Sequence, residues 1–376
     1  MIYFDSAATT FQKPPAISAA MTAAMETMSS PARGNYPAAR AAADAAFACR
    51  SELAELFHVS SPEQVVFTMN ATHGLNIAIK SLVPPGGKAV ISGYEHNAVT
   101  RPLAAIGGVE IRVAGGGLFQ PEEVLAAFDR AITPDIDAVI CNHVSNVFGF
   151  VQPVEQIAAL CQARGVPFVV DASQSGGMLP LDFSALGAAF AAMPGHKGLY
   201  GPQGTGVLLC NARSKTLLEG GTGSQSRLQE MPDFLPDRLE AGTHNMPGIA
   251  GLLAGVRFVR AQTPERICLH ERRLAQRLAE GLGAFPDFSV FATPTLRAQT
   301  GVVSFVPGRL DVETCGEQLA DGGIAVRAGL HCAPLAHRSG GTIDSGTVRV
   351  SFSIFNTEGE ITRFLSVLRE NMNRNS

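Results

Sequence analysis

The strongest constraint on the fold is a regular alternation of short apolar segments with helical segments between residues 64 and 211. The apolar runs are QVVFTM (64–69), KAVISGY (88–94), VEIRVA (109–114), DAVICNHVS (137–145), VPFVVDAS (166–173), AAFAAMP (188–194) and GVLLCN (206–211). Helical patterns at 72–82, 121–132 and 154–165 lie between them. Continuous apolar strands that alternate with helices are typical of a mostly parallel sheet covered on both faces. The sequence therefore predicts an α/β fold.

The chain is long enough for two domains, because 376 residues exceed what one hydrophobic core usually fills. Helices are expected at 14–28 and 36–57, before the alternating part. A long helical segment at 248–285, interrupted at Pro264, follows it, and shorter strand and helix patterns occupy 301–355. We predict a large domain over residues 15–255 and a smaller α+β domain made of residues 1–14 and 256–376.

Composition argues against several functional classes. The formal net charge is −4, which gives no reason to expect nucleic acid or an anionic membrane as a partner. No stretch approaches the roughly 18 consecutive apolar residues of a membrane span, and MIYFDSAATT lacks the pattern of a targeting segment. The 7 cysteines contain no CxxC pair, so neither a disulfide framework nor a metal site is expected. The cytoplasm is the expected location.

Ligands of parallel α/β sheets bind at the carboxyl ends of the strands, so polar residues that follow the apolar runs are candidate site residues. Residues 70–74 open a helix directly after one strand, and free backbone N–H groups there favour a phosphate. The other candidates at strand ends are His96, Asn146, Asp171, Gln174 and Lys197. An anion cradle, an aromatic ring, an amide, a buried acid and a lysine together match the requirements of pyridoxal 5′-phosphate.

Each residue type has a chemical reason in such a site. A lysine amine forms a Schiff base with the aldehyde of the cofactor, and Lys197 lies in a glycine-rich run, whereas Lys13, Lys80, Lys88 and Lys215 lie in ordinary solvent-facing contexts. An aspartate opposite the pyridine nitrogen keeps that nitrogen protonated, so the ring can accept electrons. These requirements make Lys197 and Asp171 the central candidates.

Motifs over residues 4–357 resemble those of one enzyme family, in order along the chain. They are FDSAATT (4–10), FTMNATHGLN (67–76), YEHNAV (94–99), HVSNVFG (143–149), DASQS (171–175), GHKGLYGPQGTG (195–206), EAGTHN (240–245), RAGLHCA (327–333) and VRVSFSIFNT (348–357). The chain resembles fold-type I pyridoxal-phosphate enzymes of the class V aminotransferase family, most closely the cysteine desulfurase and selenocysteine lyase branch. It departs from the common pattern at Pro194, where many relatives have serine, and at Gly198, an extra residue after Lys197.

The resemblance implies pyridoxal 5′-phosphate as the cofactor and gives each site residue a role. Lys197 would form the Schiff base, His96 would stack on the ring, and Gln174 would lie near the ring hydroxyl. Thr72 and His196 would hold the phosphate, together with Thr243 from the second subunit of a homodimer. The complete implied cofactor-binding set is Ala71, Thr72, His96, Asn146, Asp171, Gln174, His196, Lys197 and Thr243.

The resemblance also implies a reaction. Asn146 and Arg349 would bind the substrate carboxylate, and Lys197, His96 and Cys332 would be catalytic. L-Cysteine or L-selenocysteine would yield L-alanine, with a persulfide left on Cys332 until an acceptor takes the sulfur. Only residues 333–348 separate Cys332 from Arg349, which is similar to the family members with a compact cysteine loop that rely on a partner protein.

The residues around Cys332 favour a reactive thiol. Arg327, His331, His337 and Arg338 are close in sequence, and positive neighbours raise the thiolate fraction of a cysteine. The other cysteines fall within helical or strand patterns, where they are expected to be buried. Two alternatives stay open. The chain could be another lyase, epimerase or aminotransferase of this family in which Cys332 is not catalytic, or a cofactor-binding scaffold without activity.

Overall fold

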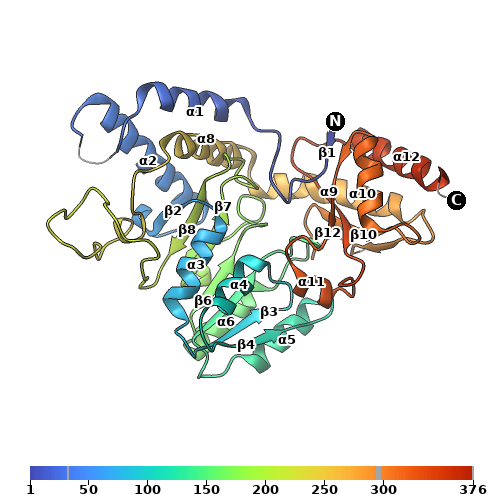
Figure 1. Cartoon of the computed structure of the whole chain (residues 1–376), viewed down its shortest axis with the longest axis horizontal. Helices are drawn as coiled ribbons and strands as arrows, with labels where there is room; N and C mark the ends of the chain where they lie inside the picture. Colours follow the sequence, from blue (N-terminus) through green and yellow to red (C-terminus); the bar gives the residue numbers. More distant parts are fainter. Residues whose placement is uncertain (32–33, 294–297, 375–376) are drawn as a thin grey trace.

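The computed structural model describes residues 1–31, 34–293 and 298–374. Figure 1 shows a large sheet with its helices on one side of the molecule and a smaller sheet with its own helices on the other. Within the described ranges, no helix has both the length and the apolar character that crossing a membrane requires.

The large sheet has seven strands in the order β2-β8-β7-β6-β5-β3-β4. Strands β4, β3, β5, β6 and β7 run parallel, whereas β8 runs antiparallel to both of its neighbours. The predicted mostly parallel α/β sheet is therefore confirmed. The strands are β2 (Val65–Thr68), β3 (Lys88–Ser92), β4 (Glu110–Ala114), β5 (Ala138–Asn142), β6 (Phe168–Asp171), β7 (Phe190–Pro194) and β8 (Gly206–Cys210).

The central strands are apolar throughout because helices cover both faces of the sheet. On β5, Ala138 and Ile140 pack into one core, and Val139 and Cys141 pack into the core on the opposite face. Helices α3 (Ala71–Leu82) and α4 (Asn97–Ala105) cover the first face. The opposite face is covered by α2 (Pro37–Leu56), α5 (Pro121–Ala131), α6 (Val154–Arg164), α7 (Phe183–Leu186) and α8 (Met246–Gln262).

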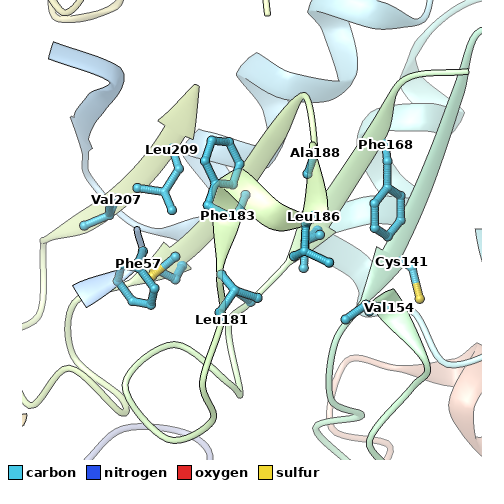
Figure 2. Close-up of a cluster of buried hydrophobic side chains, with 14 of the residues drawn as sticks. Phe57, Cys141, Val154, Phe168, Leu181, Phe183, Leu186, Ala188, Val207 and Leu209 are labelled. Atoms are coloured by element: carbon cyan, nitrogen blue, oxygen red, sulfur yellow. The ribbon is translucent and has the colours of Figure 1, made fainter. Parts of the chain in front are cut away.

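Figure 2 shows part of the core on the opposite face, where Phe168 of β6 and Cys141 of β5 lie near Leu186 of α7. On the first face, Phe190 of β7 is completely buried. Burying one such phenylalanine side chain contributes about 1.5–3 kcal/mol relative to leaving it in water. The two cores therefore fix the strand ends that carry the candidate site residues.

Helix α4 is one of several helices that the sequence pattern did not predict. It is nine residues long and contains Pro102, which lacks a backbone N–H and usually interrupts a helix. His96 caps it, because the ring nitrogen Nδ1 accepts a hydrogen bond from the backbone N–H of Ala98. Its apolar residues Val99 and Leu103 are buried against the sheet, which compensates for the unfavourable proline.

The smaller unit contains a four-stranded antiparallel sheet in the order β12-β13-β10-β9, and a short parallel pair, β1 with β11. The first strand of the chain thus belongs to this unit, and Figure 1 places the N-terminus beside it. Its elements are β1 (Ile2–Tyr3), α9 (Pro264–Leu282), β9 (Ser289–Phe291), β10 (Val302–Val306), α10 (Val312–Asp321), β11 (Ile324–Ala325), β12 (Arg327–Gly329), α11 (Pro334–Ser339), β13 (Thr347–Ser351) and α12 (Glu358–Arg374).

The predicted long helix is two helices, α8 and α9, which meet at Thr263 and Pro264. Helix α8 packs against α1 (Pro15–Thr27) and α2, whereas α9 packs against β10 and α12. The sequence placed the domain boundary at residue 255, inside α8. We propose that the boundary lies at Thr263, because all of α8 then stays with the large unit on which it packs.

Candidate functional site

A cavity of about 200 Å³ lies at the carboxyl ends of β5, β6 and β7, next to the turns that follow β2 and β3. Most of the residues predicted from the sequence line it: Ala71, Thr72, His96, Asn146, Asp171, Gln174, His196 and Lys197. Three predicted residues do not line it: Thr243, Cys332 and Arg349. The fold therefore brings most of the predicted cofactor-binding set together around one hollow.

Lys197 follows β7 in a tight turn that contains Gly195 and Gly198. Neighbouring chain segments lie so close to both glycines that a larger residue would collide with them. A Cβ at Gly195 would lie 2.1 Å from Thr205 Oγ1, and one at Gly198 would lie 2.4 Å from the carbonyl oxygen of Gly176. The family departure at Gly198 thus fits a close approach of two backbone segments. Burial lowers the pKa of Lys197 to about 8, with Asp171 acting in the opposite direction. Near neutral pH a fraction of this amine is uncharged and nucleophilic.

Asp171 is the last residue of β6, and its side chain is buried. Its Oδ1 accepts hydrogen bonds from the backbone N–H and the hydroxyl of Ser173, which fixes the carboxylate. In the part of the chain that the structure describes, Oδ2 has no hydrogen-bond partner, so this oxygen is available to a ligand. Ser173 also lines the cavity and was missed in the sequence analysis, although its place two residues after Asp171 suits such a local contact.

His96 presents a neutral ring to the cavity. Burial lowers its pKa, partly opposed by Asp171, and its Nδ1 accepts the hydrogen bond from Ala98. The remaining proton of the neutral ring is therefore on Nε2. An uncharged flat ring in this position suits stacking on an aromatic cofactor.

The start of α3 forms an anion cradle at one end of the cavity. The side chain of Asn70 caps the helix by accepting a hydrogen bond from the backbone N–H of His73 (2.9 Å). The backbone N–H groups of Ala71 and Thr72 lie within the first turn, which has no helical acceptors for them. His196, on the same cavity, has its pKa lowered to about 4, mainly by burial, and its ring is therefore neutral.

Residues 7–13 contact the turn that carries His196 and Lys197, and we call this segment the N-terminal strap. The Ala7 carbonyl accepts a hydrogen bond from Gln174 Nε2 (2.9 Å), and Ala8 lines the cavity. The Thr10 N–H and the Lys13 ammonium both donate to the His196 carbonyl (3.1 Å each). The sequence-based placement of Lys13 in solvent is therefore wrong. Burial lowers its pKa to about 8.

Arg349 lies on β13, and its guanidinium forms hydrogen bonds with Asp5 and with the backbone of Asn146. Its side chain is only 2% exposed, Nη2 donates to Asp5 Oδ1 (2.8 Å), and Nη1 donates to the Asn146 carbonyl (2.9 Å). Its Nε has no partner within the described ranges. The Asn146 side-chain amide donates to the carbonyl of His331 (2.9 Å). The predicted substrate-binding residues are thus neighbours, but Asp5, which the sequence analysis did not single out, holds the arginine.

Cys332 is exposed, whereas the other six cysteines are buried. It lies with His331 in a tight turn that the Ala333 N–H closes onto the Leu330 carbonyl (2.9 Å). Both central residues have positive φ angles, +49° and +55°, a conformation that non-glycine residues rarely adopt. The carbonyl of Cys332 accepts a hydrogen bond from the N–H of Asn97 (2.8 Å), the residue after His96. The cysteine turn is therefore fixed to the wall of the cavity.

The charges expected around Cys332 are fewer than its sequence neighbours suggested. Burial lowers the pKa of His331 to about 2 and that of His337 to about 4, so both rings are neutral near pH 7. Arg327 keeps its positive charge, because hydrogen bonds to Asp5 raise its pKa, and Cys332 adds a smaller effect in the same direction. The expectation of four positive neighbours was therefore wrong for the two histidines.

Thr243 lines a different cavity, of about 230 Å³, together with Thr68, Met69, His73 and Gly204. Met69 and His73 flank the turn of residues 70–72, whose other side lines the first cavity. Within one chain, Thr243 is therefore separated from the candidate cofactor site by the start of α3.

The chain is similar to known proteins over nearly its whole length. The family model described as aminotransferase class-V matches residues 2–364. A protein of Pyrococcus abyssi named as a probable cysteine desulfurase is 32% identical over 384 residues, covering 98% of this chain and 94% of the relative. A probable cysteine desulfurase of Xylella fastidiosa (strain 9a5c) is 33% identical over 385 residues, covering 98% of this chain and 90% of the relative. The structure of an apo cysteine desulfurase from Thermococcus onnurineus NA1 superposes with a TM-score of 0.90 at 30% identity, covering 99% and 95% of the two chains.

Proposed function

Because the chain belongs to the aminotransferase class-V family, we propose that it is a pyridoxal-phosphate-dependent cysteine desulfurase. It would convert L-cysteine or L-selenocysteine to L-alanine and keep the released sulfur or selenium on Cys332. Relatives at 30% identity or more that carry this name support the proposal. The observation that carries it is the exposed thiol of Cys332, which sits on a turn bonded to both Asn97 and Asn146 at the cavity wall.

The residues around the cavity fit pyridoxal 5′-phosphate. Asp171 offers the unpartnered Oδ2 to a protonated pyridine nitrogen, His96 offers a neutral ring face, and the N-terminus of α3 offers N–H groups to a phosphate. Lys197 offers an amine of lowered pKa to an aldehyde. When bound, the cofactor would supply a cationic ring that accepts an electron pair from the substrate α-carbon.

Lys197 and Cys332 would share the chemistry on the substrate. The Lys197 amine would take the proton from the α-carbon, which requires its uncharged form. The Cys332 thiolate would then attack the substrate sulfur, forming an S–S bond while the C–S bond breaks with its electrons left on carbon. Protonation of that carbon, and return of a proton to the α-carbon from Lys197, then give alanine. A sulfur acceptor, for which we propose a partner protein, would next take the sulfur from the exposed Cys332.

The proposal is tested by supplying the purified protein, saturated with pyridoxal 5′-phosphate, with L-cysteine, L-selenocysteine or L-cysteine sulfinate. We expect release of alanine from cysteine and selenocysteine in stoichiometric amounts with sulfide or selenide when a reductant is present. Alanine is measured by chromatography, and free sulfide colorimetrically. Pyruvate and ammonia in place of alanine would instead indicate a lyase of the same family, and no product from any substrate would leave only cofactor binding.

We also propose a cytoplasmic homodimer in which Thr243 reaches the phosphate of the partner subunit. The second cavity supports this, because Thr243 is exposed and lines it together with Met69 and His73, which flank the start of α3. Met69 and Leu218 line the same cavity with exposed apolar side chains, which a dimer would cover.

The dimer is expected to elute in size-exclusion chromatography with twice the chain mass of 39.4 kDa. Thr243→Ala is expected to keep that mass and to weaken binding of the cofactor about tenfold, as the loss of one charge-assisted hydrogen bond would. A monomer that binds pyridoxal 5′-phosphate with unchanged affinity after this substitution would contradict the assignment.

A further inference from the structure

The carboxylate of Asp5 accepts hydrogen bonds from two arginines of the smaller unit, Arg327 and Arg349. Its Oδ1 accepts from Arg349 Nη2 (2.8 Å) and more distantly from Arg327 Nε (3.3 Å), and its Oδ2 accepts from Arg327 Nε (3.0 Å) and Nη2 (2.8 Å). Asp5 and Arg349 are buried, whereas the side chain of Arg327 is half exposed. We call these three residues the Asp5 cluster.

Each residue of the Asp5 cluster is next to a different part of the candidate site. Asp5 lies just before the N-terminal strap, whose Ala8 lines the cavity, and Arg349 donates to the carbonyl of Asn146 in the cavity wall. Arg327 begins the strand that leads into the Cys332 turn. All three charges influence the pKa of Lys197, the two arginines lowering it and Asp5 raising it, after the larger effects of burial and Asp171. A substrate bound at Lys197 is therefore within electrostatic reach of the cluster.

The charges of the Asp5 cluster do not balance. Two guanidinium groups and one carboxylate leave one positive charge, and neither arginine pairs with a second acidic side chain in the described part of the chain. Arg349 Nε is buried and has no hydrogen-bond partner among the residues that the structure describes, which is an unfavourable state for a donor on a cation. One additional carboxylate would neutralise the cluster, and a free α-amino acid carries one.

We propose that Asp5 determines substrate specificity by limiting the cluster to a single uncompensated positive charge. The inference rests on the proposed function, because it takes the α-carboxylate of an amino acid as the group received there. A substrate whose only negative group is that carboxylate completes the charge balance. A substrate with a second anionic group, such as a sulfinate or sulfonate on the side chain, brings one negative charge too many and is disfavoured.

Substitutions that change the cluster charge should shift this preference in opposite directions. Asp5→Asn keeps the shape of the side chain and raises the cluster charge by one, whereas Arg327→Gln lowers it by one at a half-exposed position. The double variant restores the original charge. The probes are L-alanine, whose only anionic group is its α-carboxylate, and L-cysteate, which has a side-chain sulfonate as well. Their affinities for the cofactor-loaded protein are measured by calorimetry.

We expect D5N to raise the affinity for L-cysteate relative to L-alanine about tenfold, the effect of one additional charge-assisted hydrogen bond. R327Q should shift the ratio in the other direction, and the double variant should return it toward that of the unmodified protein. In turnover, D5N should likewise raise kcat/KM for L-cysteine sulfinate relative to L-cysteine. Glu52→Gln is the matched control, since Glu52 also pairs with two arginines, Arg257 and Arg260, but lies outside both cavities.

An equal loss of affinity for both probes in D5N would overturn the inference, because it would indicate a purely structural role. A shift of the ratio in the same direction in D5N and R327Q would overturn it as well. If D5N does not fold, R327Q alone tests the inference: its ratio of affinities for L-cysteate and L-alanine must shift toward L-alanine. Failure of the unmodified protein to form alanine would instead refute the proposed function, while the binding ratio would still decide the role of Asp5.

Discussion

Lys197→Ala is expected to yield a folded protein that forms alanine about 10⁴-fold more slowly, the upper range for loss of a positioned acid–base group. The structure gives two reasons. Lys197 is the lysine on the candidate cofactor cavity, and burial lowers its pKa to about 8, so its amine is available both to bond an aldehyde and to move a proton. Among the described residues that line the cavity, Lys197 alone offers an amine.

Cofactor attachment provides a readout that does not depend on turnover. Reduction of the cofactor-loaded protein with borohydride, followed by peptide mass mapping, should place the cofactor on Lys197 and on no other lysine. The exposed Lys215→Ala is the control and should retain both attachment and activity. Attachment to Lys13, which lies near His196 on the N-terminal strap, would contradict the assignment.

Cys332→Ser is expected to abolish sulfur transfer while leaving cofactor binding intact. A serine hydroxyl is a poor acceptor for sulfur, and loss of an enzyme nucleophile costs about 10³-fold or more in rate. Alanine and sulfide formation from L-cysteine should both fall to this extent. Because Cys332 does not line the cavity, the absorbance of the bound cofactor should not change.

The buried cysteines provide an internal control for this experiment. Burial raises the pKa of the Cys49, Cys161 and Cys315 thiols to about 12, so these thiols should resist alkylation in the folded protein. Iodoacetamide should therefore modify Cys332 first and inactivate the enzyme in parallel. If C332S still releases alanine at the original rate, the alternative of a lyase, epimerase or aminotransferase without a catalytic cysteine would be favoured.

The alternation of apolar runs was enough to predict the large sheet, because strands buried on both faces leave a signal that depends only on local sequence. The strand-end rule then selected the residues that line the cavity, including Asp171 and Lys197. Neither the alternation of apolar runs nor the strand-end rule predicted helix α4. Its stability comes from packing of Val99 and Leu103 on the sheet, which outweighs the unfavourable Pro102.

Contacts between distant segments could not be read from the sequence. Asp5 and Arg349 are separated by 344 positions, and nothing near either residue indicates that they pair. Lys13 has no local sign of burial, since its partner is the backbone of His196. The neutrality of His331 and His337 likewise follows from tertiary burial, which a count of nearby basic residues does not include.

The position of the first ten residues has a consequence for biosynthesis. Strand β1 pairs with β11 near residue 324, Asp5 and Ser6 contact Ser351 and Arg349, and Thr10 bonds to His196. During translation these residues leave the ribosome long before most of their partners are made. The segment must therefore stay unpaired until residues 324–351 have emerged, and the wall that Ala8 adds to the candidate cofactor cavity is fixed in place only after β13 has been synthesised.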